Sequence, residues 1–396
     1  GTSVADIDKI RNVAQHVKRE VDAGNQVAVV VSAMSGKTNE LVDWARQAGP
    51  IHDAREYDTV VSAGEQITSG LLALALQDIG VSARSWLGWQ IPFKTNQVHS
   101  AARIEDIGTE AINERMDDGI VCVVAGFQGI SKDNRITTLG RGGSDTSAVA
   151  LAAAIGADRC DIYTDVEGVY TTDPRIVPSA QKLEKITYEE MLEMASLGAK
   201  VLQTRSVAMA MNHKVRVQVL SSFIDKPGTL VVDEDEIVEN QVVSGIAYAK
   251  NEARVTLVGV KNKPGIASDV FMQLADGNIN VDMIIQNETE EGRKTDLTFT
   301  VTENDLEKAE KILNNADDIE FANLITDSNV AKISVIGVGM RSHAGIAAKM
   351  FKTLAERGIN IQVISTSDIK ISVLIEAEYT ELAVRALHTA YGLDGE

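Results

Sequence analysis

Residues 137–145 read TTLGRGGSD and lead directly into an alanine-rich helix pattern at 146–155. The three glycines of this stretch remove side chains, so backbone N–H groups can approach an anion closely. The start of the following helix adds a partial positive charge, and Arg141 can fork onto a carboxylate or phosphate. A tight turn capped by Ser144 or Asp145 is the simpler alternative. Such a turn needs neither three glycines nor the arginine, so the stretch indicates an anion-binding loop.

Strand and helix patterns alternate on both sides of this loop. Apolar, β-branched strand patterns cover four stretches: 26–31, 120–125, 160–164 and 215–220. Helix patterns with apolar residues every three or four positions include 4–23, 60–79, 188–196 and 200–212. Alternation of this kind predicts an α/β fold with a mainly parallel sheet covered by helices on both faces. Ligands collect at the carboxyl ends of the strands in such sheets.

The chain repeats itself beyond an acidic stretch at 233–236, which is typical of a solvated linker. Residues 253–287 match residues 331–367 in the positions of their glycines and of the Gly-Ile-Ala and Ile-Asn pairs. Each copy predicts the order strand, helix, two strands, helix and strand of a ferredoxin-like βαββαβ unit. Two copies are too few for a solenoid, so they predict a pair of small domains. The expected domains are 1–235, 243–327 and 328–396.

The composition excludes several classes of protein. The chain has 396 residues, and 38 Lys+Arg against 57 Asp+Glu give a formal charge of −19. Such a surface repels phosphate backbones and anionic lipid, so neither nucleic acid nor a membrane is expected as a partner. The two cysteines, Cys122 and Cys160, lie in apolar strand patterns and are too few for a disulfide framework or a four-cysteine zinc site. No apolar run approaches the roughly 18 residues of a membrane span, and no signal peptide is found, so a cytoplasmic protein is expected.

Three further segments have features of ligand-binding turns. Residues 32–40 contain Ser-Gly-Lys-Thr, but the position where a Walker A loop needs its first glycine is Val31, so the P-loop interpretation fails. The hydroxyl groups of this segment still suit a ligand at the end of a strand. Glu65 places a carboxylate near a helix start, with a solvated surface glutamate as the alternative. Residues 126–129 (GFQG) follow another predicted strand.

Two later segments suit a nucleotide. Residues 164–175 form a long polar excursion after a strand, with Arg175 for phosphates and Tyr170 for packing. Lys200 stands at the start of a helix, where a cation is normally unfavourable, so a phosphate partner is favoured over an exposed lysine. The six histidines show no metal-ligand spacing, and neither a metal site nor a Ser-His-Asp or Cys-His constellation is identified.

Together these segments resemble the signature motifs of the aspartokinases, in the amino acid kinase superfamily. The motifs VSAMSGKTNE, SAGEQ, GFQG, TTLGRGGSD, YTDVEGVYTTDPR and GAKVLQ occur in family order, and the repeat resembles paired ACT domains of the lysine- and threonine-regulated type. The resemblance implies a three-layer αβα amino acid kinase domain followed by two ACT domains. It implies transfer of the γ-phosphate of MgATP to L-aspartate, giving 4-phospho-L-aspartate, the first committed step toward lysine, methionine, threonine and isoleucine. A kinase of glutamate or acetylglutamate and a non-catalytic amino acid sensor are the alternatives.

The resemblance also assigns roles to single residues. Aspartate and the transferring phosphate would be held by Ser32, Thr38, Glu65, Arg141, Gly142, Gly143 and Ser144. ATP would be held by Gly1, Ser32, Ser144, Thr164, Asp165, Tyr170, Thr171, Thr172, Asp173, Pro174, Arg175 and Lys200. The catalytic residues would be Arg141, which pairs with the substrate α-carboxylate, Asp145, which orients lysines, and Lys200. The acceptor carboxylate is already ionised at pH 7, so positioning and charge neutralisation suffice without a general base.

Regulation is the last property that the resemblance implies. A helix start with free N–H groups suits the carboxylate of an amino acid, and each copy offers one. Lysine and threonine would bind near Asn262, Ala267, Asn280, Val281, Asp282 and Gln286, and near Ile346, Ala347, Asn360, Ile361, Ser367 and Asp368. Packing of a dimer is the alternative role for these residues. An oligomer through the ACT domains is expected, with a separate regulatory subunit made of that region as a further possibility.

The chain departs from the family pattern at its start. The family opens with Lys-Phe-Gly-Gly-Thr-Ser, whose lysine neutralises the transferring phosphate, whereas the chain begins at Gly1-Thr2-Ser3. Glu167 stands where Asp is usual, a change expected to be tolerated, and the family often has an acidic residue in place of Asn262.

Overall fold

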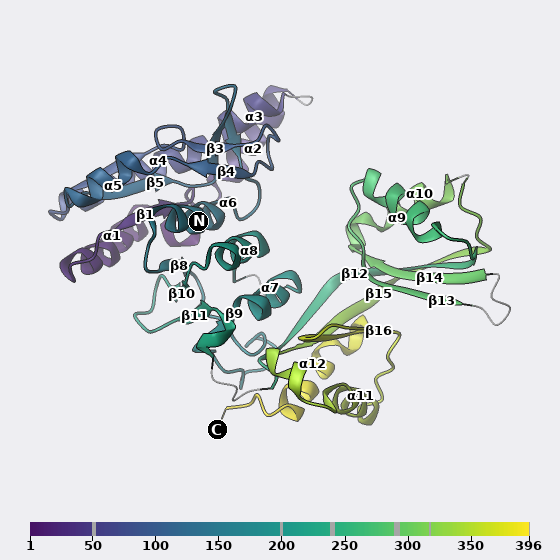
Figure 1. The fold of residues 1–396 in the computed structure, drawn as a ribbon. Coiled ribbons are helices and arrows are strands. Elements are labelled where there is room, and N and C mark those ends of the chain that lie inside the picture. Colours follow the sequence, from purple (N-terminus) through teal and green to yellow (C-terminus); the bar gives the residue numbers. More distant parts are fainter. Residues whose placement is uncertain (50–52, 199–200, 238–241, 289–293, 317, 396) are drawn as a thin grey trace. The chain divides into compact units, whose positions relative to one another are not determined.

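The computed structural model describes the chain except for residues 50–52, 199–200, 238–241, 289–293, 317 and 396 (Figure 1). The chain divides into two compact units. The first unit comprises residues 1–169, 182–196 and 200–238, and the second comprises 170–181, 197–199 and 239–396.

The first unit alternates strands and helices. Its helices are η1 (Thr2–Val4), α1 (Ile7–Asp22), α2 (Lys37–Ala48), α3 (Ala54–Val61), α4 (Ala63–Asp78), α5 (Glu110–Asp117), α6 (Gly143–Ile155), α7 (Tyr188–Ser196), α8 (Thr204–His213) and η2 (Glu234–Glu236). Its strands are β1 (Ala28–Val31), β2 (Ala83–Trp86), β3 (Phe93–Thr95), β4 (Ile104–Ile107), β5 (Val121–Ala125), β6 (Gln128–Ser131), β7 (Ile136–Thr138), β8 (Cys160–Thr164), β9 (Lys185–Thr187), β10 (Val217–Ser221) and β11 (Thr229–Val232).

These strands form three sheets, of orders β1-β5-β2, β8-β10-β11-β9 and β4-β3-β6-β7. The first sheet is wholly parallel, and β8 pairs with β10 in parallel. Strand β5 shows the layering, because its alternate side chains enter two cores. Val121 and Val123 pack with α1 and α4, whereas Cys122 and Val124 pack with α5 and α6. The predicted αβα arrangement with a mainly parallel sheet is therefore confirmed, and both cysteines are buried and free.

Two helices differ from the sequence pattern. The apolar stretch predicted as one helix at 60–79 is α3 and α4, which meet at Ser62, and α2 begins inside the hydroxyl-rich segment 32–40. By length and hydropathy, Ala54–Asp78 passes as a candidate membrane span among the described residues. Half of its most apolar window is buried inside the protein, as in the core helix of a soluble domain.

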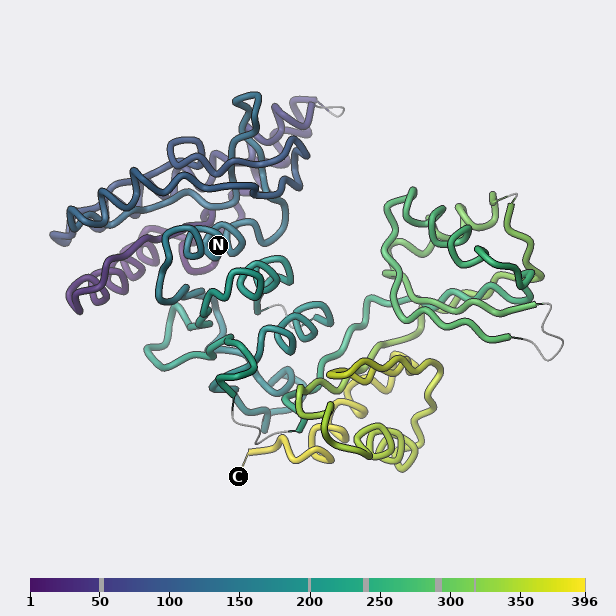
Figure 2. The backbone as a smooth tube through the Cα atoms, viewed as in Figure 1, coloured from purple at the N-terminus to yellow at the C-terminus, as the bar shows by residue number. Residues whose placement is uncertain are grey.

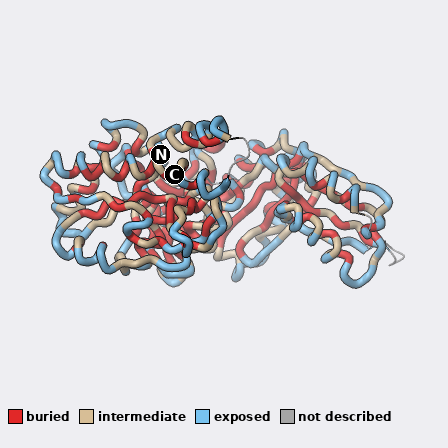
Figure 3. The backbone as a smooth tube through the Cα atoms, turned by 90° about the horizontal axis from the view of Figure 1, so that it is seen from above, coloured by how far each residue is buried: buried red, intermediate tan, exposed pale blue. Residues whose placement is uncertain are grey.

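The second unit contains one six-stranded sheet, of order β13-β14-β12-β15-β17-β16. Its strands are β12 (Gly245–Lys261), β13 (Asp282–Glu288), β14 (Lys294–Val301), β15 (Asn323–Ile336), β16 (Val363–Thr366) and β17 (Lys370–Glu376). Its helices are α9 (Ile266–Asp276), η3 (Glu303–Asp305), α10 (Leu306–Asn314), η4 (Val338–Ser342), α11 (Ile346–Glu356), η5 (Ala377–Tyr379) and α12 (Thr380–Ala390). Figure 3 shows buried backbone in the interior of the protein and exposed backbone mostly along its outside. Among the strands, β5 is buried along its whole length, whereas β13 has only Met283 buried.

The long antiparallel strands β12 and β15 run side by side through two modules (Figure 2). Register shifts near Glu252 divide them, so 245–249 pair with the end of β15 and 254–258 pair with its beginning. The first module has its core within 253–319, and the second draws on 243–246 and 333–393. The first strand of the second module therefore precedes the first module in the chain. The bounds predicted for the two small domains, 243–327 and 328–396, do not include this exchange of a strand, and they remain a prediction.

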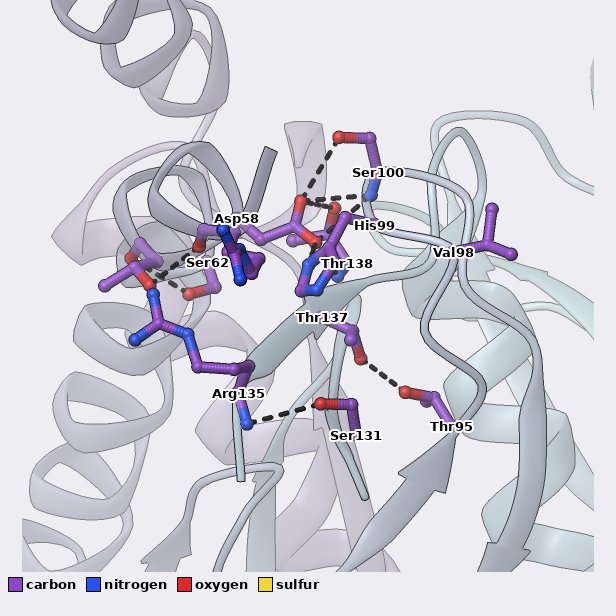
Figure 4. Close-up of polar contacts among 12 residues, drawn as sticks. Asp58, Ser62, Thr95, Val98, His99, Ser100, Ser131, Arg135, Thr137 and Thr138 are labelled. Atoms are coloured by element: carbon purple, nitrogen blue, oxygen red, sulfur yellow. Dashed lines mark hydrogen bonds and ion pairs between the residues drawn. The ribbon is translucent and has the colours of Figure 1, made fainter. Parts of the chain in front are cut away.

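A buried carboxylate fixes the approach to the stretch 137–145. Asp58, in α3, is fully buried and accepts hydrogen bonds from the backbone N–H and the hydroxyl of Thr138, at 3.0 and 2.7 Å. Its other donors are His99 Nδ1 at 2.8 Å and the N–H and hydroxyl of Ser100 (Figure 4). The end of β7 is thus tied to α3 and to the loop before β4.

Replacing this carboxylate is expected to destabilise the first unit. Asp58→Asn keeps the size of the side chain but turns an N–H₂ group toward donors. We expect a loss of about 3 kcal/mol in the free energy of unfolding, measured with urea. Asp106→Asn, which breaks an exposed pair with Lys94, is the matched control and should leave that free energy unchanged. Equal free energies of unfolding for the two variants would contradict the stabilising role of the Asp58 carboxylate.

Candidate active site

The stretch 137–145 forms the turn predicted for an anion. Gly140 and Gly142 have φ angles of +77° and +69°, a left-handed conformation that favours glycine. A Cβ on Gly142 would also lie 2.1 Å from the side chain of Gln203. Helix α6 begins at Gly143, and no described side chain caps it, so neither Ser144 nor Asp145 plays the capping role. Gly143 donates its own N–H to the carbonyl oxygen of Gly140 at 3.0 Å, so among the described residues the N–H groups of Ser144 and Asp145 are the first-turn donors open to a ligand.

The predicted turn at 126–129 lies against this helix start. A Cβ added to Gly126 would meet the backbone and side chain of Ser144 at 3.1 Å. Phe127, with a φ angle of +66°, donates its N–H to Ser147 Oγ at 3.0 Å, one turn further along α6. The turn at 126–129 and the glycine turn within 137–145 are separate in the sequence, but in the structure they lie against each other.

Glu65 is buried, so the alternative of a solvated surface glutamate is wrong. Its carboxylate stands in the first turn of α4, and Oε1 accepts the N–H of Ala33 at 3.0 Å. Within the described part of the chain, Oε2 is buried without a hydrogen-bond partner. Burial raises the pKa of Glu65 to about 7. An unpaired buried carboxylate oxygen needs a cation or donor, which a ligand ammonium group would supply.

Several other predicted site residues lie in the same region. A cavity of about 680 Å³ is lined by Gly1, Ser32, Ser144 and Asp145, together with β1 and β8, which are edge strands of separate sheets. Burial raises the pKa of Asp145. Asp145, Glu65 and Asp165 all lie within electrostatic range of the backbone nitrogen of Gly1. The structure thus places the carboxylates of Asp145, Glu65 and Asp165 near one another, around Gly1.

The remaining residues predicted for aspartate are more open. Thr38 is half-buried in the first turn of α2, and Arg141 is exposed beside the start of α6. A guanidinium at that position has the freedom to fold onto a bound carboxylate.

The residues predicted for ATP are only partly described. Thr164 ends β8 and Asp165 follows it, and the Thr164 hydroxyl donates to Asp165 Oδ1 at 3.2 Å. Arg175 is exposed but forks onto Asp173, at 3.0 and 2.7 Å, and this holds the pKa of Asp173 down at about 2. Tyr170, Thr171, Thr172 and Pro174 lie in the same segment, within the second unit. Lys200 lies outside the described residues.

The residues predicted for effectors form two equivalent sets. Gly265 and Gly345 start α9 and α11 with nearly equal φ angles, +93° and +92°, and neither helix has a cap from a described side chain. Ala267 lies just inside the first of these helices, and Ile346 and Ala347 begin the second. The other positions are the loops and strand starts at Asn262, Asn280, Val281, Asp282, Gln286, Asn360, Ile361, Ser367 and Asp368. Asp282 is already paired with the buried Lys332 at 2.8 Å.

Two supporting residues escaped the sequence analysis. Asp58 shares the buried face of α3 with Val61, so an acid at a core-facing helix position was the available signal. Arg205, in α8, donates to the carbonyl oxygens of Leu139 and Ala102 at 2.6 and 2.5 Å. Because Arg205 bonds to backbone carbonyl oxygens, its partners can be of any residue type, and the sequence carries no pattern that reveals the contact.

Family models match nearly the whole chain. The amino acid kinase family matches residues 1–221, and two ACT domain models match 254–318 and 333–391. An aspartate kinase of Pseudomonas putida is 53% identical over 396 residues, covering 100% of this chain and 96% of the relative. An aspartokinase of Corynebacterium glutamicum is 47% identical over 401 residues, covering 100% and 95%.

Solved structures agree with these relatives. Aspartokinase III of E. coli, in complex with aspartate and ADP, is 28% identical with a TM-score of 0.82, and the match covers 98% of each chain. Its complex with lysine and aspartate is 26% identical with a TM-score of 0.78, covering 98% of this chain and 97% of the other. The family and fold expected from the motifs are confirmed. The chain therefore belongs to the aspartokinases, the aspartate kinases of the amino acid kinase family that carry ACT domains.

Proposed function

We propose that this aspartate kinase joins the γ-phosphate of MgATP to the β-carboxylate of L-aspartate at the uncapped start of α6, giving 4-phospho-L-aspartate. The observation that carries the proposal is the glycine turn before α6, with Glu65 buried and Asp145 nearby. The reaction would be the first committed step toward lysine, methionine, threonine and isoleucine, in the cytoplasm.

The substrate would be held by complementary charges at both ends. Glu65 would take its ammonium group, because Oε2 is buried and unpaired among the described atoms. Arg141 would take the α-carboxylate, with Thr38 beside it. Gly142, Gly143 and Ser144 would face the transferring phosphate, and the N–H of Ser144 would help to neutralise its negative charge. The acceptor carboxylate has a pKa near 4 and is already ionised at pH 7, so no general base is required.

The nucleotide would be held by Gly1, Ser32 and Ser144 in the cavity, by Thr164 and Asp165, and by the segment 170–175. Asp145 would orient cationic groups, and Lys200 would neutralise phosphate charge. Among the described residues, no group of three or more His, Cys, Asp or Glu is placed to hold a metal ion. Mg²⁺ would arrive with ATP, since in nucleotide sites it is bound largely by phosphates, water and one or two carboxylates. When bound, Mg²⁺ would neutralise charge on the phosphate oxygens.

Lysine and threonine are proposed as feedback inhibitors that bind at the starts of α9 and α11. The proposal is supported by the matching uncapped helix starts and by a bound lysine in the E. coli relative. Symmetric pairing of ACT modules between chains would complete the pockets and give an oligomer. A separate regulatory subunit made of the ACT region remains a prediction.

The substrate assignment is tested by trapping the product. Protein carrying the Lys-Phe-Gly opening of the family should convert aspartate, MgATP and hydroxylamine to aspartyl hydroxamate, measured by its colour with ferric iron. Glutamate and acetylglutamate should give no product above the background. Product from either of these instead of aspartate would reassign the substrate. Lysine or threonine binding in calorimetry without any turnover would favour the sensor alternative.

The role of Glu65 predicts a particular pH dependence. Its ionised form pairs with the substrate ammonium, so protonation near its pKa of about 7 removes that partner. We expect kcat/KM for aspartate to fall as the pH drops through about 7. Glu65→Gln should lower kcat/KM for aspartate about 100-fold and abolish this acid limb. Glu114→Gln, on the exposed face of α5, should behave as the wild type, and an unchanged pH profile in Glu65→Gln would refute the role.

The effector sites are tested by filling them. Lysine and threonine together are expected to inhibit far more than either alone, because each stabilises the same inactive arrangement. Ala267→Leu and Ser367→Tyr place bulk at the two predicted pockets and should abolish inhibition. The measurement is the ratio of rates with and without effector in each variant. Full inhibition of both variants would show that the pockets lie elsewhere.

A further inference from the structure

The segment proposed to hold the nucleotide packs into the second ACT module. Residues 170–181 belong to the second unit, and Ile176, Val177 and Ala180 lie in the same core cluster as Leu387 of α12. Ala180 also forms an isolated antiparallel bridge with Asp394, at the C-terminal end of the described chain. The segment is therefore continuous with the ACT module rather than an independent loop.

Thr171 is the point where the segment is held most closely. Its N–H donates to the carbonyl oxygen of Gln181 at 2.9 Å, and its own carbonyl accepts the N–H of Ile246 from β12 at 2.7 Å. Its side-chain oxygen accepts the N–H of Gln181 at 3.0 Å and lies 2.8 Å from Nε2 of His388. Both Thr171 and His388 are buried, so water does not compete for these bonds.

The direction of the hydrogen bonds follows from the partners. Asp394 accepts the Ser179 hydroxyl, and that bond leads the causes that lower its pKa, so the carboxylate is an acceptor. His388 Nδ1, 3.0 Å from Asp394 Oδ1, therefore carries a proton and donates it. Since Gln181 already donates to the Thr171 oxygen, the hydroxyl proton is directed at Nε2. The carboxylate, imidazole and hydroxyl form one oriented chain.

Two further side chains of the module hold the same segment. Arg385, one turn before His388 in α12, donates Nε to the carbonyl oxygen of Ile176 at 2.9 Å. The Tyr248 hydroxyl, from β12, donates to Asp173 Oδ2 at 3.0 Å. That carboxylate also carries Arg175, the predicted phosphate contact. Each bond fixes the segment from outside the proposed nucleotide site.

We propose that His388 is a positioning residue for the nucleotide, acting through Thr171 on the segment 170–175. The inference rests on the proposed nucleotide role of that segment. His388 itself would touch neither substrate, and loss of its bond to Thr171 would let the segment move. Nucleotide affinity would then fall, while affinity for aspartate, bound by residues of the first unit, would hold. A histidine that only fills the core of the module would alter stability without this selectivity.

Two substitutions separate the two bonds of the imidazole. Asn has its amide nitrogen at the position of Nδ1, so His388→Asn can keep Asp394 but loses Thr171. Gln reaches the position of Nε2, so His388→Gln can keep Thr171 but loses Asp394. We expect His388→Asn to raise KM for ATP, and Kd for ADP in calorimetry, about fivefold, as expected for one buried hydrogen bond. KM for aspartate should stay within about twofold, and His388→Gln should retain ADP affinity.

Ser334→Ala is the control for stability. It removes one of two buried hydroxyl groups, Ser334 and Ser372, that bond at 2.7 Å in the same module away from the segment. It should lower the thermal midpoint and leave Kd for ADP unchanged. If His388→Asn does not fold, Asp394→Ala replaces it, because alanine leaves no acceptor for the Nδ1 proton that orients the imidazole. The expected change in ADP affinity is then about twofold in the same direction.

The outcomes separate the inference from the function on which it rests. Arg175→Ala should weaken ADP binding if the segment holds the nucleotide, and unchanged binding would overturn that proposed role. Weaker binding in Arg175→Ala together with wild-type binding in a folded His388→Asn, or in Asp394→Ala, would overturn the positioning role alone. An equal loss of ADP affinity in Ser334→Ala would also overturn it, because the effect would then follow stability.

Discussion

The buried carboxylate of Asp58 is the interaction on which the site geometry depends. Removing a carboxylate from water is costly unless donors surround it, so Asp58 requires His99, Ser100 and Thr138 to stay where they are. Thr138 is two residues before Gly140, and Arg205 holds the carbonyl of Leu139 between them. Both contacts lie on the N-terminal side of the glycine turn, so the strand end that leads into it is held from α3 and from α8. The open helix start can therefore keep a fixed direction.

Local patterns predicted most of the fold because most of it is locally determined. The β-branched run at 120–125 can only be a buried strand, and its alternate residues supply two cores. The repeat of residues 253–287 at 331–367 was also visible in the local sequence, since each copy carries its own glycines and apolar spacing. The origin of the second module's first strand was not predictable in this way. Pairing of 245–249 with 332–336 joins segments on either side of the first module, and no local pattern records such a choice.

The residues of the candidate site also divide into those that local sequence predicted and those that depend on tertiary packing. The glycine turn was predicted because three glycines and an arginine before a helix are an unusual pattern, whereas the role of Glu65 came from the resemblance of its motif to the family. The burial of Glu65 was not predicted, since it depends on the packing of α4 against β1 and its turn. Arg175 shows the opposite case. Its sequence context favoured phosphate, yet its guanidinium forks onto Asp173 two residues earlier. A ligand must therefore compete with a local ion pair, which spacing alone did not reveal.

Placement of the segment 170–181 in the ACT unit bears on how inhibition would work. The helix starts of α9 and α11 and the oriented chain through His388 belong to one unit with one continuous sheet. An effector changes nucleotide affinity only to the extent that it binds one arrangement of that unit better than another. Linkage then requires the converse, that bound nucleotide changes effector affinity by the same factor. A regulatory domain that merely covered the active site would act by exclusion, whereas a shared core would make the affinities for nucleotide and effector depend on the same conformational equilibrium.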